Sequence, residues 1–399
     1  MNTPAPSLTS RREFIHLAGL GAAVLGFSAQ GAEKVIPGFE QSKADAATSK
    51  GWKPVSDRKI RVGIAGYGLC KFGTQFGFQD HPNVQVVAVT DLIPERCGEL
   101  AKACRCDKTY PSLEEMVKDD SIEAVFIATD APSHARHCLE ALQHGKHVAT
   151  AVPAVFGSLE DAEMVFQAVK ASGRKYMMFE TSAFHADVHA MRQIYRAGGF
   201  GKLVYAEGEY FHYMNEPLAS YKDWRVGLPP QWYPTHSNGY YVCVGGGSFT
   251  EVSCMGMPSQ VPHLQAANNK YKNPFGTEIA QFRTSEGGMA RMAVSWDTPG
   301  AGGEMGRIRG QRGTFYDAYA GQEKKLPPLE RPPLPPGVQP GGHGGSHGHL
   351  MNEFVTAILE DREPLVNVAW ALNLTVAGIV AHQSALKGGE LMKIPQYKI

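Results

Sequence analysis

The fold is decided by one stretch, Lys59–Asp91, which reads KIRVGIAGYGLCKFGTQFGFQDHPNVQVVAVTD. Its apolar run Ile60–Ala65 has the length and composition of a strand that is buried on both faces. A glycine turn, Gly66-Tyr67-Gly68, follows the run and leads into a segment that can be helical. This order of elements predicts the start of a βαβ unit that binds a nucleotide.

The glycine turn also predicts how the nucleotide is held. Gly66 allows a tight turn, and Gly68 lets the backbone approach a pyrophosphate that lies on the N–H groups of a helix N-terminus. The second strand, Val84–Thr90, ends at Asp91, where a carboxylate can accept hydrogen bonds from the adenosine ribose hydroxyls. Because a carboxylate there would repel a 2′-phosphate, we expect NAD rather than NADP.

The glycine fingerprint is nevertheless incomplete. Its third glycine would fall at Lys71, and only Gly73 lies nearby. Without the flanking strand and Asp91, the same glycines would indicate no more than a tight connection between a strand and a helix.

The start of the chain has the features of an export signal. Arg11 and Arg12 precede the apolar run Leu17–Ala29, a pattern typical of a twin-arginine signal, which we place at residues 1–32 with a linker at 33–58. The alternative is an uncleaved amphipathic helix. The run is too short for a stable membrane span. We therefore expect an exported, periplasmic protein whose partner during export is the twin-arginine translocon.

Export in the folded state would constrain the chemistry. A nicotinamide enzyme outside the cytoplasm has no obvious pool in which to recycle its cofactor. Either NAD stays bound and is regenerated within each turnover, or an unusual partner reoxidises it.

Composition excludes several kinds of partner and site. The 399 residues carry no net charge and have a pI near 7.2, so neither nucleic acid nor an anionic membrane surface is expected as a partner. The seven cysteines are odd in number and scattered, which argues against a disulfide framework. Cys104-Arg105-Cys106 lacks the spacing of a common zinc pair and no second pair follows, so we expect no metal there.

Strands and helices alternate after Asp91. The expected elements are a helix Pro94–Cys104, a capping box at Ser112, a strand Glu123–Thr129, a helix Pro132–His144 and a strand Lys146–Ala151. This pattern predicts an α/β fold that begins with a doubly wound parallel Rossmann domain over residues 59–181. The ends of its strands should line one crevice. We expect the dinucleotide contacts to be Gly66, Tyr67, Gly68, Asp91, Arg96, Thr129, His134 and Pro153.

The spacing of several residues after the glycine turn resembles the Gfo/Idh/MocA family of nicotinamide-dependent sugar oxidoreductases. These residues are Ala128-Thr129, His134, Ala141-Leu142, Gly145-Lys146-His147-Val148 and Pro153. The resemblance implies a second domain whose open, mostly antiparallel sheet carries the substrate site and often the oligomer contact. We therefore expect a homo-oligomer that binds a small carbohydrate. Many members have Glu-Lys-Pro where this chain has Ala151-Val152-Pro153, so the lysine that commonly assists proton transfer is absent.

A narrower resemblance is to a branch of this family, the NAD-dependent glycoside hydrolases of the α-N-acetylgalactosaminidase type. It rests on Met177-Met178-Phe179-Glu180, Gly201–Gly208, Trp224-Arg225, Tyr233–His236 and His343-Gly344-Gly345. The resemblance implies oxidation of a sugar hydroxyl by bound NAD, elimination of the aglycone, addition of water and return of the hydride. The acid that the branch has before Val-Pro is Ala151 here, and its tyrosine after the Glu180 segment is Phe184.

Oxidation of an alcohol also needs a base for the hydroxyl proton. His236 is the leading candidate, because an imidazole titrates near neutrality, and Tyr240 would share its face if the segment is helical. The alternative is a histidine that caps a helix or fills a core site.

Substrate contacts are expected from side chains that can stack on a sugar or form hydrogen bonds with it. Trp224 and Arg225 could do both, although a core tryptophan beside a surface ion pair would give the same sequence. His185 could equally belong to an exposed helix face. The residues expected at the substrate are Glu180, His185, Trp224, Arg225, Tyr233 and His343.

The second domain is expected to be an α+β domain over residues 182–366. Alternating segments predict antiparallel strands at Glu278–Phe282, Ala290–Trp296 and Arg307–Tyr319. The proline-rich residues 326–340 should be extended.

A glycine loop with three histidines follows the proline-rich segment and leads into a helix at Leu350–Glu360. His343, His347 and His349 could bind a metal, but without carboxylate or cysteine partners in the loop we expect none. A last helix, Val368–Leu386, lies in the segment 367–399 that should return to the Rossmann domain.

These inferences predict an exported NAD-dependent oxidoreductase that transfers a hydride to or from a hydroxyl or keto group of a sugar or glycoside. One alternative is redox-neutral glycoside cleavage through a transient ketone. Another is a binding or assembly protein that kept the fold but lost catalysis, which Ala151, Val152 and Phe184 would explain.

Overall fold

The structure is a computed structural model that describes residues 46–399, which lie within one compact unit. The expected export signal at residues 1–32 and the first part of the expected linker lie outside the described residues. Within the described part of the chain, no helix combines the length and the apolar character that crossing a bilayer requires.

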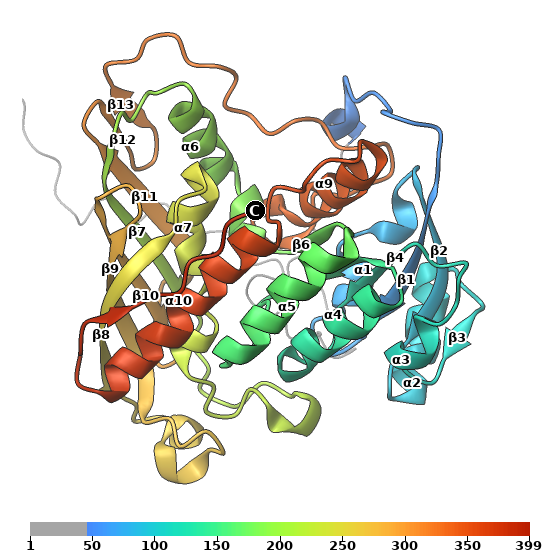
Figure 1. Cartoon of the computed structure of the whole chain (residues 1–399), viewed down its shortest axis with the longest axis horizontal. Coiled ribbons are helices and arrows are strands. Elements are labelled where there is room, and N and C mark those ends of the chain that lie inside the picture. The colour runs from blue at the N-terminus through green and yellow to red at the C-terminus, as the bar shows by residue number, and fades with distance from the viewer. Residues whose placement is uncertain (1–45) are drawn as a thin grey trace, which may run out of the picture. The chain divides into compact units, whose positions relative to one another are not determined.

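The first sheet has six parallel strands in the order β3-β2-β1-β4-β5-β6 (Figure 1). Its strands are β1 (Ile60–Ala65), β2 (Val84–Thr90), β3 (Thr109–Tyr110), β4 (Ala124–Ile127), β5 (His147–Thr150) and β6 (Tyr176–Met178). This is the strand order of a doubly wound dinucleotide-binding sheet, in which the direction of winding reverses between β1 and β4. The predicted Rossmann fold is confirmed.

Short and medium helices connect these strands, and their ends follow local signals in the sequence. They are α1 (Phe72–Gln75), α2 (Pro94–Cys104), α3 (Leu113–Met116), α4 (His134–Gln143) and α5 (Leu159–Ser172). Ser112 caps α3 as predicted, because its hydroxyl accepts a hydrogen bond from the N–H of Glu115 at 3.3 Å. Gly145 follows α4 with a φ of 69°, the left-handed conformation that commonly ends a helix.

The second sheet has eight strands in the order β13-β12-β11-β7-β10-β9-β8-β14. Neighbouring strands are antiparallel except for β7 and β10, which are parallel. The bounds are β7 (Leu203–Phe211), β8 (Phe249–Pro258), β9 (Phe275–Thr284), β10 (Met289–Ser295), β11 (Gly303–Gly310), β12 (Gly313–Phe315), β13 (Tyr319–Gly321) and β14 (Met392–Lys393). The predicted second domain with a mostly antiparallel sheet is confirmed.

The strand predicted at Arg307–Tyr319 is wrong. This segment is divided among β11, β12 and β13, which pair with one another through tight turns, and β11 begins earlier, at Gly303. An alternating pattern can continue on both sides of a tight turn, so the period of the side chains did not mark where the chain reverses.

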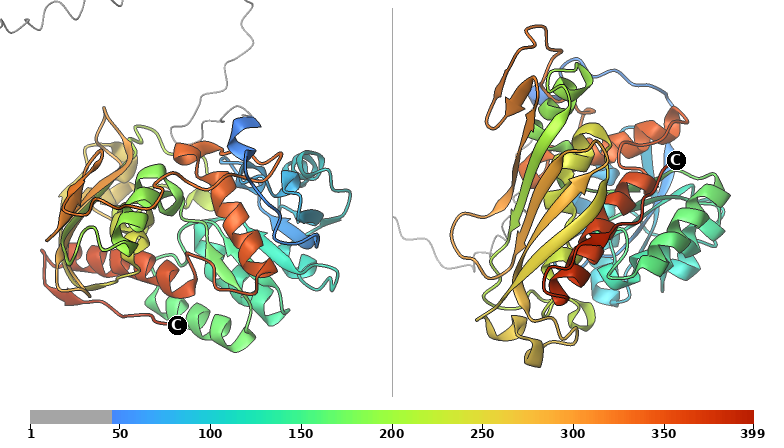
Figure 2. Two further views of the ribbon diagram at one scale, coloured as in Figure 1. Left: turned by 90° about the horizontal axis from the view of Figure 1, so that it is seen from above. Right: turned by 60° about the vertical axis from the view of Figure 1, so that its left-hand side comes forward.

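Helices α7 (Thr235–Gly245) and α10 (Val368–Leu386) pack on the second sheet, and α6 (Ala186–Arg196) adds a further layer on α7. Helix α7 packs on β7, β10 and β11 (Figure 2). Residues 326–340 contain neither helix nor strand, as predicted, and lead to α8 (Gly342–Gly345) and α9 (His347–Leu359). The helix expected at Leu350–Glu360 therefore begins one turn earlier.

Helix α10 (Val368–Leu386) joins the two domains. It packs on β8 of the second sheet and on α5 and β6 of the first domain (Figure 2). A buried pair, His382 Nδ1 and Glu278 Oε1 at 2.8 Å, links the helix to β9. The expected return of residues 367–399 to the Rossmann domain thus describes only part of this segment, because β14 pairs with β8.

Gly208 in β7 sets how closely α7 can approach the second sheet. A Cβ at this position would overlap the carbonyl oxygen of Ser237 and lie 2.8 Å from the sulfur of Met292. We expect Gly208→Ala to lower the free energy of unfolding by about 1–3 kcal/mol, the usual cost of overpacking, as measured by denaturant titration.

The matched control is Gly98→Ala in α2, where a Cβ would meet no atom within 4 Å. This change should stabilise the chain by about 0.5–1 kcal/mol, because alanine favours a helix over glycine. Equal effects of the two substitutions would contradict the packing argument.

Candidate active site

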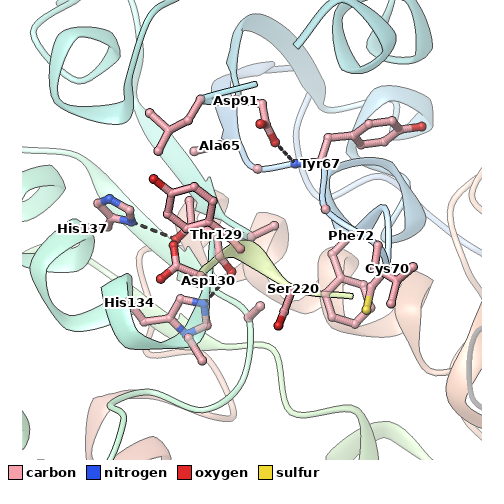
Figure 3. A pocket seen from close by; sticks show the side chains of 18 of the residues that line it. Ala65, Tyr67, Cys70, Phe72, Asp91, Thr129, Asp130, His134, His137 and Ser220 are labelled. Carbon is pink, nitrogen blue, oxygen red and sulfur yellow. Dashed lines mark hydrogen bonds between the residues drawn. The ribbon is translucent and has the colours of Figure 1, made fainter. Parts of the chain in front are cut away.

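A cavity of about 210 Å³ lies at the carboxyl ends of β1, β2 and β4 (Figure 3). We call it the outer cavity. From the first domain, its walls are the glycine turn after β1, Asp91 after β2, Thr129 after β4 and the Ala151-Val152 segment after β5. The second domain adds residues 219–221, Trp224, Arg225 and Tyr233. Ligands of doubly wound sheets bind at this point, where the strand order reverses.

The glycine turn leaves room for a dinucleotide. A Cβ on Gly66, whose φ is 105°, would overlap the carbonyl oxygen of Ala128, so only glycine lets the chain turn this close to β4. A Cβ on Gly68 would meet no atom within 4 Å, and Gly68 lines the outer cavity. A Cβ on Gly73 would lie 2.7 Å from Gly66 O and 2.9 Å from Leu100 Cδ1. Gly73 therefore provides the close helix packing that the third fingerprint glycine normally allows.

Asp91 is fixed beside this turn by two backbone hydrogen bonds. Its Oδ2 accepts from the N–H of Tyr67 at 2.7 Å, and its Oδ1 accepts from the N–H of Ile93 at 2.8 Å (Figure 3). A carboxylate oxygen has more than one acceptor position, so both oxygens can still accept from ribose hydroxyls. The turn and Asp91 together have the shape and the donor set that suit a dinucleotide.

The other residues expected at the dinucleotide differ in their positions. Tyr67, Arg96 and Thr129 line the outer cavity. His134 lines it as well, but its Nδ1 lies 2.8 Å from Pro153 O and its Nε2 lies 3.2 Å from Thr129 O. Burial also lowers the pKa of His134, so this side chain braces the ends of β4 and β5 rather than binding a phosphate. Pro153 does not line the cavity, and its predicted contact with the cofactor is corrected accordingly.

A smaller inner cavity adjoins the outer cavity between the two domains. The two share Leu69, Cys70, Phe72, Ala151, Val152, Arg225 and Tyr233. The inner cavity is completed by Phe76, Phe179, Thr181, Tyr210, His212, Leu218, His236 and His343. An apolar wall with a few convergent polar groups is typical of a small-molecule site. His236, Arg225, Tyr233 and His343 were all predicted to act here.

His236 lies in the first turn of α7, and Glu180 fixes its orientation. Its Nδ1 lies 2.8 Å from Glu180 Oε1 and 3.2 Å from Thr181 Oγ1. The two side chains of this pair are 3% and 0% exposed. Because Nδ1 is engaged, Nε2 is the ring nitrogen left to act on a ligand in the inner cavity.

Glu304 of β11 belongs to the same cluster and was missed by the sequence analysis. Its carboxylate is 4% exposed and lies 2.6 Å from His343 Nδ1, 3.2 Å from His185 Nε2 and 3.6 Å from His236 Nδ1. No motif surrounds Glu304. It reaches the site only because β11 pairs with β7, which places Glu304 opposite Tyr210.

The two carboxylates determine the charge of His236. Burial lowers the pKa of the imidazole, but the charges of Glu180 and Glu304 outweigh burial and raise the pKa to about 9. Burial raises the pKa of Glu304, yet the three neighbouring histidines hold it well below its usual range. At neutral pH, His236 is therefore an imidazolium between two carboxylates.

Arg225, Trp224 and Tyr233 form a group on the side of the second domain. The Arg225 guanidinium lies 4.2 Å from the centre of the Trp224 ring and 5.8 Å from that of Tyr233. Burial raises the pKa of Tyr233 to about 12 although Arg225 opposes the shift. The phenol is thus a hydrogen-bond donor at neutral pH, beside a permanent cation. Trp224 lines the outer cavity, as a stacking platform should.

Besides Pro153, three residues predicted at the site line neither cavity. Tyr240 lies on α7 one turn after His236, but its hydroxyl is 3.5 Å from His185 Nδ1 and it lines no cavity wall, so its predicted catalytic role is corrected. Glu180 and His185 were predicted to contact substrate. They instead hold His236 and Glu304 from behind the wall.

The cluster could also be considered as a cation site. Ligand atoms of Glu180, His236 and Glu304 lie within 4.8 Å of one another, a spacing that one divalent ion could bridge. The imidazolium already supplies a positive charge between the carboxylates, so we expect a shared proton there rather than a metal. Of the other loop histidines, His347 packs against Phe76 with ring centres 4.5 Å apart and ring planes tilted by 43°, and His349 lines a separate cavity.

Comparison with known sequences agrees with this geometry. Residues 60–180 match the model of the Gfo/Idh/MocA oxidoreductase family, with an NAD-binding Rossmann fold. A glycosyl hydrolase family 109 protein of Porphyromonas gingivalis is 24% identical over 67% of this chain, and the match covers 61% of that relative. A family 109 protein of Solibacter usitatus is 22% identical over 98% of this chain and 97% of its own length. With a Bacteroides fragilis relative, 24% identical over 57% of this chain, the match covers about half of the relative, 52%.

Solved structures share the fold. A levoglucosan dehydrogenase in complex with NADH and levoglucosan superposes with a TM-score of 0.67 at 17% identity, over 85% of this chain and 100% of its own. The myo-inositol 2-dehydrogenase of Lactobacillus plantarum gives the same TM-score, identity and coverage. This likeness extends over both domains and shows the architecture.

We expect the cluster of Glu180, His236 and Glu304 to hold no stoichiometric metal. The full chain, purified without a metal-affinity tag, should contain far less than one equivalent of zinc, manganese or iron by plasma mass spectrometry. The control is Glu278→Gln, which alters the buried Glu278–His382 pair instead. A full equivalent of metal that is lost in Glu304→Gln and kept in Glu278→Gln would show that the cluster is a cation site.

Proposed function

Residues 60–180 form an NAD-binding domain of the Gfo/Idh/MocA oxidoreductase family, and from this premise we propose that the chain transfers a hydride between NAD and a hydroxyl or keto group of a sugar or glycoside. The names of two structural neighbours, levoglucosan dehydrogenase and myo-inositol 2-dehydrogenase, support this class of substrate.

One observation carries the proposal: the outer and inner cavities share a wall. The residues that suit a dinucleotide line the outer cavity, and His236 lines the inner cavity. Ala151, Val152, Arg225 and Tyr233 line both. A substrate in the inner cavity would thus lie next to the cofactor and to an imidazole at the same time, as an alcohol oxidation requires.

The chain's own groups have distinct tasks in this reaction. NAD, when bound, accepts or returns the hydride. In its neutral form, which prevails above its pKa of about 9, His236 takes the hydroxyl proton on Nε2, since its Nδ1 is held by Glu180. Arg225 and Tyr233 are donors that stabilise the negative charge that develops on the oxygen. This set provides a base without the lysine that many family members have at the position of Val152.

We propose NAD rather than NADP as the cofactor. The Asp91 carboxylate lines the outer cavity beside the glycine turn, where it would repel a 2′-phosphate. In a fluorescence titration, NADPH should bind more weakly than NADH. Equal affinities would count against this assignment.

Redox-neutral glycoside cleavage is the second candidate function. It is favoured by the curated relatives, which are named glycosyl hydrolase family 109 proteins. Phe184, where that branch has a tyrosine, lines neither the outer nor the inner cavity, so the missing hydroxyl leaves no gap in their walls. Ala151 does line both cavities, and the lack of a carboxylate there removes an acid. For this reason net hydride transfer remains the first candidate.

We further propose that the chain is exported through the twin-arginine route. The support is the sequence of Arg11 and Arg12 before Leu17–Ala29. Replacing both arginines by lysine should keep the protein in the cytoplasm, which cell fractionation would detect.

His236→Asn should slow hydride transfer by about 10²–10⁴-fold, because it removes the general base. The measurement follows the absorbance of reduced nicotinamide while a panel of sugars and aryl glycosides is supplied with NAD. A signal that rises and persists indicates net oxidation. Release of aglycone without a lasting signal indicates redox-neutral cleavage.

Binding of NAD should be unchanged in His236→Asn, since His236 lines only the inner cavity. The control is His382→Asn, which alters another buried histidine that is paired with a glutamate at 2.8 Å and lines neither cavity. Its activity per folded molecule should match the wild type. Full turnover in His236→Asn would exclude His236 as the base and would favour a protein that no longer uses this site for catalysis.

The pH profile of oxidation should report the charge of His236. Below about 9, its pKa, the imidazole carries a proton and cannot act as a base, so kcat/KM should rise with pH and level off above that value. Glu180→Gln removes a carboxylate that stabilises the imidazolium, so the pKa falls and the plateau begins at lower pH. Glu278→Gln should leave the profile in place. An unchanged pH profile in Glu180→Gln would show that the titrating group is not the His236 imidazole paired with Glu180.

A further inference from the structure

A third cavity, of about 520 Å³, lies apart from the site and shares no lining residue with the outer or inner cavity. We call it the arginine cavity. Except for Phe184, its lining residues come from α6, α9, the connection between α9 and α10, the start of α10 and the proline-rich segment. Figure 1 labels these three helices. Its lining residues are Phe184, His189, Arg192, Gln193, Arg196, Arg331, Pro332, His349, Asn352, Glu353, Arg362, Glu363, Pro364, Leu365, Asn367 and Trp370.

The two carboxylates of this cavity are already paired. Glu353 binds Arg362 through both oxygens, at 2.6 and 2.9 Å. Glu363 lies 3.5 Å from Lys175 Nζ. Neither carboxylate is therefore left to form a close ion pair with another arginine of the cavity.

The remaining arginines have no such partner. Among the described residues, Arg192, Arg196 and Arg331 form no ion pair with any carboxylate. Arg196 is exposed at the rim, whereas Arg331 is half-buried and Arg192 is only 4% exposed. Three positive charges thus face one cavity without a close ion pair, and the anions that act on them within the described part of the chain are Glu353 at Arg192 and Asp187 at Arg331, from beyond ion-pair distance.

Arg192 has the strongest need of a counter-charge. Its Nη1 donates to the carbonyl oxygens of Ala183 and Cys243, both at 2.9 Å. Carbonyl oxygens satisfy the N–H groups but do not neutralise a full charge, and an unpaired buried charge is costly. Burial lowers the pKa of Arg192 to about 10, so the guanidinium is still charged at neutral pH.

The two histidines of the cavity are neutral hydrogen-bonding groups. Burial, reinforced by the neighbouring arginines, lowers the pKa of His189 to about 4 and that of His349 to about 3. Trp370 adds an aromatic wall. Guanidinium groups around neutral donors and an aromatic surface are the chemistry that recognises a phosphate or sulfate group.

We propose that the arginine cavity binds a tetrahedral oxyanion, a sulfate or phosphate group, either as the free ion or carried by a saccharide. Arg192 and Arg331 would hold it from the inside, and Arg196 from the rim. This binding does not depend on the function proposed for the outer and inner cavities.

Arg331 gives the cavity a direct connection to the site. Its Nη1 donates to the carbonyl oxygens of Phe184, Gly344 and Gly345, at 2.9, 3.0 and 2.9 Å. Gly344 and Gly345 directly follow His343, whose Nδ1 contacts Glu304 in the buried cluster. An anion that binds Arg331 would therefore contact the same guanidinium that holds the loop of His343, Gly344 and Gly345 in place.

Isothermal titration of the full chain at constant ionic strength tests the proposal. The probes are inorganic sulfate, inorganic phosphate, N-acetylglucosamine 6-sulfate and unsulfated N-acetylglucosamine, with chloride as the background anion. We expect saturable binding of the oxyanions with one site per chain. Tighter binding of the sulfated sugar than of sulfate identifies a saccharide-borne group, and equal affinity identifies the free ion.

Variants assign the binding to this cavity rather than to the glycine turn. Arg196→Gln, at the exposed rim, should weaken binding about tenfold, and Arg331→Gln should weaken it further. Arg174→Gln is the control, since Arg174 is also exposed and without an ion pair among the described residues. The proposal fails if no oxyanion binds in a saturable way, if the unsulfated sugar binds as well as the sulfated one, or if both cavity variants bind like Arg174→Gln.

Discussion

The hydrogen bond between Glu180 and His236 is the interaction on which the arrangement of the site depends. Glu180 follows β6, the last strand of the first sheet, and His236 lies in the first turn of α7, which packs on the second sheet. Glu304 adds a third element, β11. Each charge in this cluster is almost inaccessible to water, and a buried charge is tolerated only when a partner neutralises it. The two domains must therefore dock in one orientation, because any other orientation would leave a buried carboxylate or imidazolium alone.

The pairing of Glu180 with His236 also determines which atom of the histidine can take part in the reaction. A histidine that must pair with Glu180 through Nδ1 can offer only Nε2 to the inner cavity, so orientation and tautomer are decided together. The carboxylates then set the charge of the ring: they raise its pKa to about 9, so the ring is an acid at neutral pH and becomes a proton acceptor above that value. The chain thus provides a proton acceptor at the junction of two cavities although the usual family lysine is replaced by Val152.

Local sequence patterns predicted the elements of the first domain well. They could not predict contacts between segments that are distant in the sequence. The bounds of β1, β2 and α2, the cap at Ser112 and the cavity position of Asp91 follow from residues that are near in sequence. Glu304 could not be found in this way, since its place depends on the pairing of β11 with β7. The predicted positions of Tyr240 and Pro153 differ from the observed ones for a related reason. Val152, next to Pro153, and His236, one helical turn before Tyr240, line the cavities. The side chain of Tyr240 and the carbonyl of Pro153 instead face other protein groups.

Residues 366–393 complete both domains. Val366 accepts a backbone hydrogen bond from Met178 at the edge of the first sheet, α10 packs on both domains, and β14 pairs with β8 in the second sheet. During synthesis, a ribosome releases this segment after all the other strands of both sheets, so the edges of β6 and β8 stay uncovered until it emerges. A chain without this segment would present both edges to solvent and to other chains. One late segment therefore protects both sheets against pairing with the wrong strand.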